Sequence, residues 1–170
     1  MGLKILGTIF ILVGCGGFGL KLVSNHLYEE RSLRELIRVL DFMECELQYH
    51  LTPLPDLCRQ AAAESTGIIQ KTFYLLSSQL EDQLSPDVGQ CVQRTLAQIK
   101  TIPHLSYSAM ELLGRSLGRF DIEGQLKGLE AVRQECRTKL NTLMENRDIR
   151  LRNYQTLGLC AGAALAILLI

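Results

Sequence analysis

Side chains suited to chemistry are sparse in this 170-residue sequence and stand far apart. The histidines His26, His50 and His104 form no H-x-x-x-H pair, the spacing that puts two metal ligands on one helical turn. Glu44 and Glu46 are two residues apart, so on a helix they point to different faces and cannot act together as acid and base. We therefore expect no catalytic residue and no metal site; a membrane-bound enzyme using the histidines and Glu44 is the remote alternative.

Nucleotide and nucleic-acid sites are also not indicated. The stretch "LLGRSLGRF", residues 112–120, resembles a phosphate loop but lacks the Lys-Ser/Thr end and a preceding strand. The formal net charge is zero and no dense Lys/Arg patch occurs, which argues against nucleic-acid binding. The sequence predicts no cofactor.

The cysteines are scattered without a C-x-x-C pair, unlike a disulfide framework or a zinc site. We interpret them as free, buried thiols in a reducing compartment. They are Cys15, Cys45, Cys58, Cys91, Cys136 and Cys160.

The two ends of the sequence are apolar, whereas the middle is charged. All 18 acidic residues lie between Glu29 and Asp148. Residues 5–20 are uncharged with a lysine at each flank, and residues 153–170 contain no charge. Such segments are typical of membrane spans with snorkelling flanks. The sequence therefore predicts a transmembrane helix over 1–22, a soluble region over 23–152 and a second transmembrane helix over 153–170.

Basic residues near the predicted spans set the expected orientation. Lys21 and Arg31 follow the first span, and Arg150 and Arg152 precede the second, whereas the opposite flanks offer only one lysine and the amino terminus. By the positive-inside rule, the soluble region faces the cytoplasm.

The first apolar segment has a second interpretation. "LVGC", residues 12–15, fits a bacterial lipoprotein cleavage site, which would leave Cys15 lipidated and the middle of the chain exported. Apolar residues resume after Cys15 and Lys21 closes a longer span, which favours the membrane helix. The alternative protein is a lipid-anchored, exported helical binding protein.

The second predicted span carries small residues every four positions, at Gly158, Gly162 and Ala166. Such a ladder lets two helices approach closely in lipid. We expect it to pack on the first span or on partner helices; the alternative is that Gly and Ala are simply common in membrane helices.

The charged middle shows helical periodicity and no convincing strand alternation. Apolar residues recur about every 3.6 positions between Ser32 and Leu47, with Ser32 as the expected N-cap and Glu35 completing a capping box. Glu44 lies at the edge of this apolar stripe. Further helices are predicted over Pro55–Glu64, Ile68–Leu80, Pro86 to about Lys100 with Ser85 as cap, Ser106–Leu117, and from a cap at Asp121 to beyond Arg152. We expect an all-α bundle of about six helices flanked by the two spans.

A proline corner separates the first two of these helices. The first helix ends around Tyr49, and Pro53 and Pro55 prevent its continuation because proline lacks an amide hydrogen and disfavours the α conformation in the preceding residue. Thr52 suits the cap of the next helix. The stretch is expected to form a tight corner stiffened by two fixed φ angles.

Two stretches resemble the stage III sporulation protein AB family of endospore-forming bacteria. They are "LRELIRVLDFMECELQYHLTPLPDLCRQAA", residues 33–62, and "LLGRSLGRFDIEGQLKGLE", residues 112–130. That family is in turn similar to the cytoplasmic domain of type II secretion F platform proteins, with their L-P-L-P and LG-x-x-x-G-x-x-D motifs. The matching positions are Pro53, Leu54, Pro55, Gly114, Gly118 and Asp121, with Gln125 fitting the sporulation version.

The resemblance implies a role rather than a reaction. Such proteins are membrane components of a secretion-like channel between mother cell and forespore, and platform proteins couple a cytoplasmic ATPase to the membrane assembly. A non-enzymatic scaffold on the mother-cell side of the outer forespore membrane is therefore expected, with other channel subunits and the ATPase as partners. Candidate partner-binding or structural positions are Glu44, Tyr49 and the motif residues; the alternative for the glycines is a helix cap and a turn.

Overall fold

The computed structural model describes residues 27–82, 87–118 and 121–169, with side chains through Glu145, and these ranges contain helices and no strand. The first helix covers residues 27–49 of the described chain. The others are α2 (Leu54–Ala63), α3 (Gly67–Glu81), α4 (Val88–Gln98), α5 (His104–Ser116) and α6 (Ile122–Leu169). The predicted all-α class and its six helices are confirmed over these ranges, whereas the predicted span 1–22 lies outside them.

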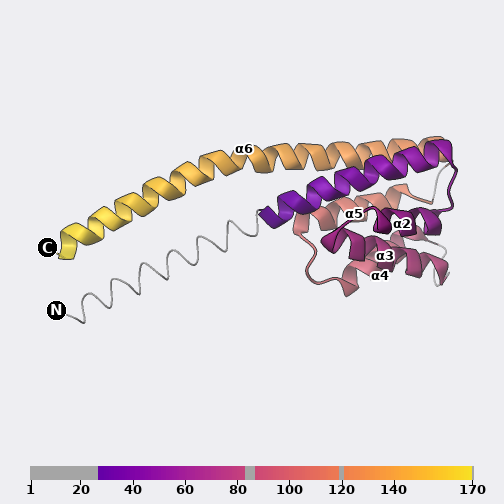
Figure 1. Cartoon of the computed structure of the whole chain (residues 1–170), viewed down its shortest axis with the longest axis horizontal. Helices are drawn as coiled ribbons and strands as arrows, with labels where there is room; N and C mark the ends of the chain where they lie inside the picture. The colour runs from indigo at the N-terminus through magenta and orange to yellow at the C-terminus, as the bar shows by residue number, and fades with distance from the viewer. Residues whose placement is uncertain (1–26, 83–86, 119–120, 170) are drawn as a thin grey trace.

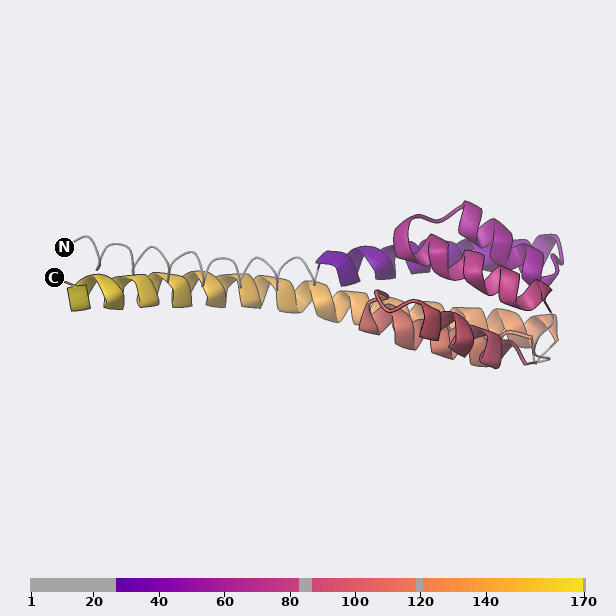
Figure 2. The same cartoon turned by 90° about the horizontal axis from the view of Figure 1, so that it is seen from below.

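The first helix and α6 lie side by side and antiparallel (Figure 1 and Figure 2). Arg34 Nη2 lies 3.2 Å from Met144 Sδ, and Arg133 Nη1 lies 2.5 Å from Glu44 Oε2, so the start of one helix faces the later part of the other. The short helices pack as successive neighbours, with α2 on α3, α3 on α4, α4 on α5, and α5 on α6.

This up-and-down order gives the bundle two different ends. The carboxyl ends of the first helix, α3 and α5 gather at one end with the amino ends of α2, α4 and α6, and we call this the distal end (Figure 2). The first helix starts at the other end, where α6 also continues beyond the bundle; we call this the proximal end (Figure 1).

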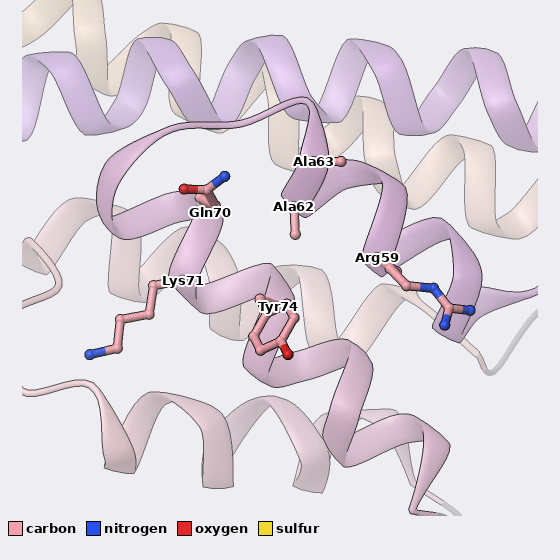
Figure 3. Close-up of a pocket in the computed structure, with 6 residues that line it drawn as sticks. All are labelled: Arg59, Ala62, Ala63, Gln70, Lys71 and Tyr74. Carbon is pink, nitrogen blue, oxygen red and sulfur yellow. The ribbon is translucent and has the colours of Figure 1, made fainter.

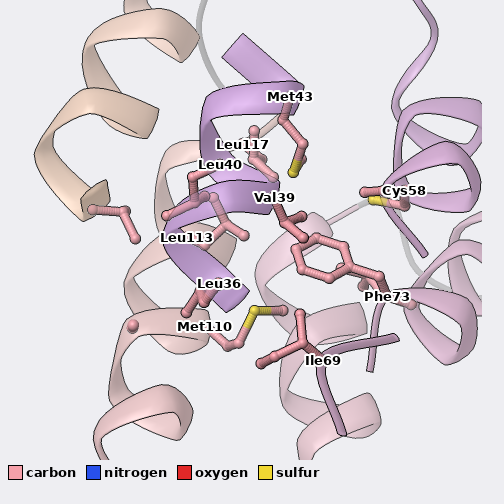
Figure 4. Close-up of a cluster of buried hydrophobic side chains, with 14 of the residues drawn as sticks. Leu36, Val39, Leu40, Met43, Cys58, Ile69, Phe73, Met110, Leu113 and Leu117 are labelled. Atoms are coloured by element: carbon pink, nitrogen blue, oxygen red, sulfur yellow. The ribbon is translucent and has the colours of Figure 1, made fainter. Parts of the chain in front are cut away.

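The core forms where the apolar stripes of the first helix, α3 and α5 converge (Figure 4). Each fully buried Leu, Met or Phe side chain contributes about 1.5–3 kcal/mol relative to exposure, so this cluster dominates folding. The fully buried members include Leu36, Leu40, Met43, Phe73, Met110 and Leu113. In the first helix, the 3.6-residue periodicity predicted the burial of Leu36, Leu40 and Met43, because helical spacing places them on one face.

The predicted N-cap at Ser32 is wrong, because the chain is already helical at residue 27. Ser32 is buried, and its Oγ accepts a hydrogen bond from Ser106 Oγ of α5 at 2.9 Å. Glu35 caps a different helix, since its Oε1 accepts from the backbone N–H of Thr66 at 2.6 Å at the start of α3. The two residues of the predicted capping box, Ser32 and Glu35, instead connect the first helix to α5 and to α3.

The predicted cap of α4 is also displaced. Asp87, rather than Ser85, is the N-cap of α4, and its carboxylate accepts from the Gly89 N–H at 3.1 Å. Asp121 fulfils its prediction at the start of α6, where its Oδ1 accepts from the Gly124 N–H at 3.0 Å.

The last helix is continuous over 48 residues, as the lack of a breaker before Arg152 predicted. Residues 153–169 of the second predicted span form its end. Over the described part of the chain, hydropathy identifies no helix with an 18-residue stretch apolar enough to cross a bilayer. The two membrane spans therefore stay predictions.

Candidate functional site

The two family-like signatures, far apart in the chain, meet at the distal end. Gly118 has a φ of +77°, and a Cβ placed on it would overlap the side chain of Val88 and lie 3.8 Å from Leu54 Cδ2. Leu54 comes from the proline corner, and Val88 from the first turn of α4. Two predicted site residues, Gly118 and Leu54, are thus close together in the fold. Val88, which was not predicted as a site residue, lies against Gly118.

The proline corner is built around the start of α2. Pro53 is the N-cap with φ −56° and ψ 145°, Pro55 lies in the first turn, and the Leu57 N–H donates to the Pro53 carbonyl at 2.8 Å. Thr52 is not the cap that its type predicted. Its Oγ1 instead donates to Glu46 Oε2 at 3.0 Å, which ties the corner back to the first helix.

Gly114 marks a close crossing of α4 and α5. It is buried, and a Cβ there would lie 2.9 Å from both Cβ and Cγ2 of Val92. A Cβ on Gly89 of α4 would in turn lie 3.5 Å from the Gly114 carbonyl oxygen. Valine in a helix has one favoured rotamer and cannot turn away, so this approach requires glycine.

Gly118 and Asp121 act as a turn and a cap between α5 and α6. Gly118 follows the C-cap Leu117 of α5 with a left-handed φ, the conformation that favours glycine after a helix. The Gln125 N–H donates to the Asp121 carbonyl at 2.9 Å, which starts the α6 ladder. Gly118 and Asp121 therefore form a turn and a cap, and a role for them in partner binding stays a prediction.

Glu44 lies away from the corner, in a charged seam between the first helix and α6. Arg133 Nη1 lies 2.5 Å from Glu44 Oε2 and 2.8 Å from Asp41 Oδ1, and Glu130 pairs with Nη2 of the same arginine. The Arg133 side chain is 18% exposed, and its Nε has no hydrogen-bond partner among the described residues. Glu44 thus aligns two helices.

Three apolar side chains at the distal end are exposed; together we call them the distal patch. Tyr49 is 71% exposed, Leu51 62% and Ile122 45%. Leu51 also has a φ of 53°, and a left-handed backbone costs a non-glycine residue about 1–2 kcal/mol. Tyr49 was predicted as a site residue. Leu51 was not predicted as a site residue. It lies just after a helix end, a place that glycine usually takes, and this exception could have drawn attention to it.

A shallow hollow of about 460 Å³ lies between α2 and α3 (Figure 3). Its lining is mostly apolar, with Tyr74 63% exposed, and its Arg59 is already paired with Asp56 and with Glu81 at 3.1 Å. No acid, base and nucleophile are combined among its lining residues Arg59, Ala62, Ala63, Gln70, Lys71 and Tyr74.

The cysteines of the described bundle are not joined in disulfides, and Cys58, Cys91 and Cys136 are buried, as the prediction had it. Burial raises the pKa of Cys58 to about 12, so it stays protonated at neutral pH. Cys45 is exposed, which corrects the expectation that all are buried. No group of three or more His, Cys, Asp or Glu side chains in the described ranges is arranged to hold a metal ion.

The small residues Gly158, Gly162 and Ala166 all fall within α6. Residues four apart on a helix share one face, so the ladder exists as a helical stripe. Its packing partner stays a prediction.

Comparison with known proteins gives one consistent result. The family model for stage III sporulation protein AB matches residues 4–170. The stage III sporulation protein AB of Bacillus subtilis (strain 168) is 26% identical over 171 residues, covering 99% of each chain. A solved structure of a stage III sporulation protein AB superposes with a TM-score of 0.61 at 20% identity, covering 72% of this chain and 98% of that one. That likeness shows a shared fold.

Proposed function

The chain belongs to the stage III sporulation protein AB family, and from that premise we propose that it is a non-enzymatic membrane scaffold. Its place is the secretion-like channel between mother cell and forespore that endospore formation requires. The helical bundle lies in the mother-cell cytoplasm at the outer forespore membrane, where it docks a cytoplasmic ATPase beside other channel subunits.

The proximal end supports attachment to a membrane. The first helix starts at this end, and α6 leaves the bundle there (Figure 1). The described chain therefore enters and leaves the bundle at the same end, an arrangement that suits the proposed spans 1–22 and 153–170 in one membrane. No charged residue follows Arg152, which suits burial of the last segment in lipid.

The exposed distal patch is the observation that carries the docking function. Tyr49 and Leu51 lie just before a corner that is held by two prolines and by the Thr52–Glu46 hydrogen bond. Exposed aromatic and aliphatic side chains on a rigid element are typical of binding anchors. Their position at the end opposite the membrane attachment suits a partner that arrives from the cytoplasm.

An ATPase partner is proposed because the sequence contains no phosphate-binding motif of its own. Two of the described polar groups that could do chemistry are engaged or inactive. Glu44 is held by Arg133, and the Cys58 thiol remains protonated.

The docking function is tested with the full-length chain in nanodiscs and the ATPase subunit of the same complex. Tyr49→Ser combined with Ile122→Ser should weaken ATPase binding at least about tenfold and reduce spore counts. The matched control changes Tyr28 and Met144, exposed by 44% and 43% at the proximal end, to serine and should leave both unchanged. Absence of ATPase binding by the wild-type chain contradicts the proposal.

The topology is tested through Cys45, the exposed cysteine of the described bundle. In intact cells, a membrane-impermeant maleimide should not label Cys45. After the cells are lysed, it should label Cys45 of the wild type, and the Cys45→Ser chain should lack this label. Cys45-dependent labelling in intact cells contradicts a cytoplasmic bundle. A diacylated Cys15 found by mass spectrometry would then establish the lipid-anchored, exported alternative.

A further inference from the structure

We propose that Leu51 is the anchor of the distal patch and that its partner presents an apolar socket rimmed by Lys and Arg side chains. The inference rests on the proposed docking function and gives it a central residue and a partner chemistry. It is carried by a left-handed leucine that packing does not explain and by the surplus of carboxylates among the described residues of the distal end.

The backbone at Leu51 is unusual for its residue type. Of the three left-handed positions in the described ranges, Gly67 and Gly118 are glycine, and only Leu51 carries a side chain. A hydrophobic residue just after a helix normally offsets this cost by packing on the last helical turn. With 62% of Leu51 exposed, burial within this chain does not provide that compensation.

The corner also holds Leu51 in place. Thr52, the next residue, donates a hydrogen bond to Glu46 of the first helix, and Pro53 after it has a φ of −56°. The side chain is therefore an apolar projection on a pre-ordered backbone, so little conformational entropy is lost when a partner binds it.

Side chains, rather than helix dipoles, set the charge of the distal end. The amino ends of α2, α4 and α6 and the carboxyl ends of the first helix, α3 and α5 meet there, so their partial charges offset one another. Carboxylates outnumber cations among the described residues of this end. The carboxylates are Glu46, Asp56, Glu81, Asp82, Asp87, Asp121 and Glu123, and the cations are Arg59, Arg115 and Lys127.

This charge selects the partner. Complementary potentials speed association and fix orientation, so an acidic rim favours a basic one on the other protein. An anionic lipid surface attracts basic segments and would repel this end. The occupant is therefore a protein surface, a basic-rimmed apolar socket on the ATPase.

The first test separates stability from binding. Leu51→Gly and Leu51→Asn remove the strained leucine, so the Tm of the full-length chain should rise by about 1–4 °C. The same variants should bind the ATPase at least about tenfold more weakly and lower the spore count. Tyr74→Gln, which alters a ring 63% exposed on α3, is the matched control and should change none of these.

The outcomes distinguish this inference from the docking function. Equal ATPase binding by wild type and Leu51→Gly overturns the role of Leu51, and so does a lower Tm in both variants. If wild type binds no ATPase, the proposed partner is wrong. The role of Leu51 is then tested by counting the spores of strains in which the Leu51 variants are expressed at the same level as the wild-type protein. Normal spore counts then overturn the anchor, whereas fewer spores from a more stable chain support it.

The second test addresses the rim. Glu123 is 74% exposed, and Glu123→Lys should slow association with the ATPase several-fold, by roughly 3–10 times. Wild-type binding should also weaken as NaCl rises, because exposed charges are screened. If neither Glu123→Lys nor a higher NaCl concentration changes ATPase binding, the proposal that the partner carries a basic rim is wrong.

Discussion

The α4–α5 crossing at the distal end and the charged seam between the first helix and α6 join helices in opposite ways. At the crossing, Gly114 lets Val92 approach the helix backbone, and Gly118 makes room for Val88. At the seam, Arg133 reaches across to Asp41 and Glu44 through a long side chain.

The crossing and the seam should respond differently to substitution of their residues. Backbone and β-branched atoms cannot move apart to admit a methyl group, so the crossing has one workable geometry. The carboxylates of the seam are partly exposed, at 46% for Asp41 and 29% for Glu44, so water can replace part of what the arginine supplies. The crossing fixes how closely α4 and α5 approach, and the seam joins the two long helices through Arg133.

Gly118→Ala tests the crossing most severely. Left-handed strain and overlap with Val88 together should lower the free energy of unfolding by about 2–5 kcal/mol. Gly67→Ala is the matched control, because Gly67 has a φ of +65° but nothing within 4 Å of its added Cβ, and should cost only about 1–2 kcal/mol. Urea unfolding measures both.

Val88→Ala provides the rescue. If the overlap is real, the double change should recover part of the loss caused by Gly118→Ala. Equal destabilisation by Gly118→Ala and Gly67→Ala would show that backbone strain alone causes the loss. The Val88 side chain would then leave room for a methyl group at Gly118.

Gly114→Ala should cost about 1–3 kcal/mol, because the added methyl meets Val92 at 2.9 Å with no left-handed strain involved. Val92→Ala in the same chain should relieve the overlap while removing a buried side chain. A Gly114→Ala chain as stable as wild type in thermal unfolding would contradict a backbone-limited crossing.

Arg133→Met tests the seam, where three carboxylates would lose their common cation. We expect a loss of about 1–2 kcal/mol, less than for a fully buried pair because the carboxylates reach water. Arg137→Met is the control, since Arg137 is 49% exposed and 3.8 Å from Asp41, and should be nearly neutral. A loss as large as that of Gly118→Ala would remove the contrast between the two junctions.

Glu35→Gln should have the smallest effect, about 1 kcal/mol, through the weaker cap on α3. The hydrogen bond from Arg38, with those from Thr66, lowers the pKa of Glu35 below its ordinary 4.5. The stabilisation is therefore present at neutral pH and is lost as pH falls through the lowered value. The difference in free energy of unfolding between wild type and Glu35→Gln should therefore shrink as the pH falls below 4.5. A difference that stays constant with pH would contradict a charge-dependent cap on α3.

Local patterns predicted much of the fold. The buried faces, the proline corner and the Asp121 cap follow from apolar spacing and from bonds within a few residues, so a single stretch of chain contains the whole cause. The misplaced caps at Ser32 and Thr52 share one reason: a short polar residue near a helix start also suits a contact elsewhere. At α4 the cap is Asp87, two residues beyond the predicted Ser85.

The sequence by itself determined an all-helical chain, where its helices break, and the family to which its motifs point. Only the tertiary structure decided that Glu35 caps a helix 31 residues away and that Glu44 meets Arg133 across 89 residues. It also decided that Gly118 faces Leu54 and that Leu51 stands exposed in a left-handed turn. Helix formation depends on neighbours along the chain, whereas these contacts depend on which helices pack together, which no short stretch encodes.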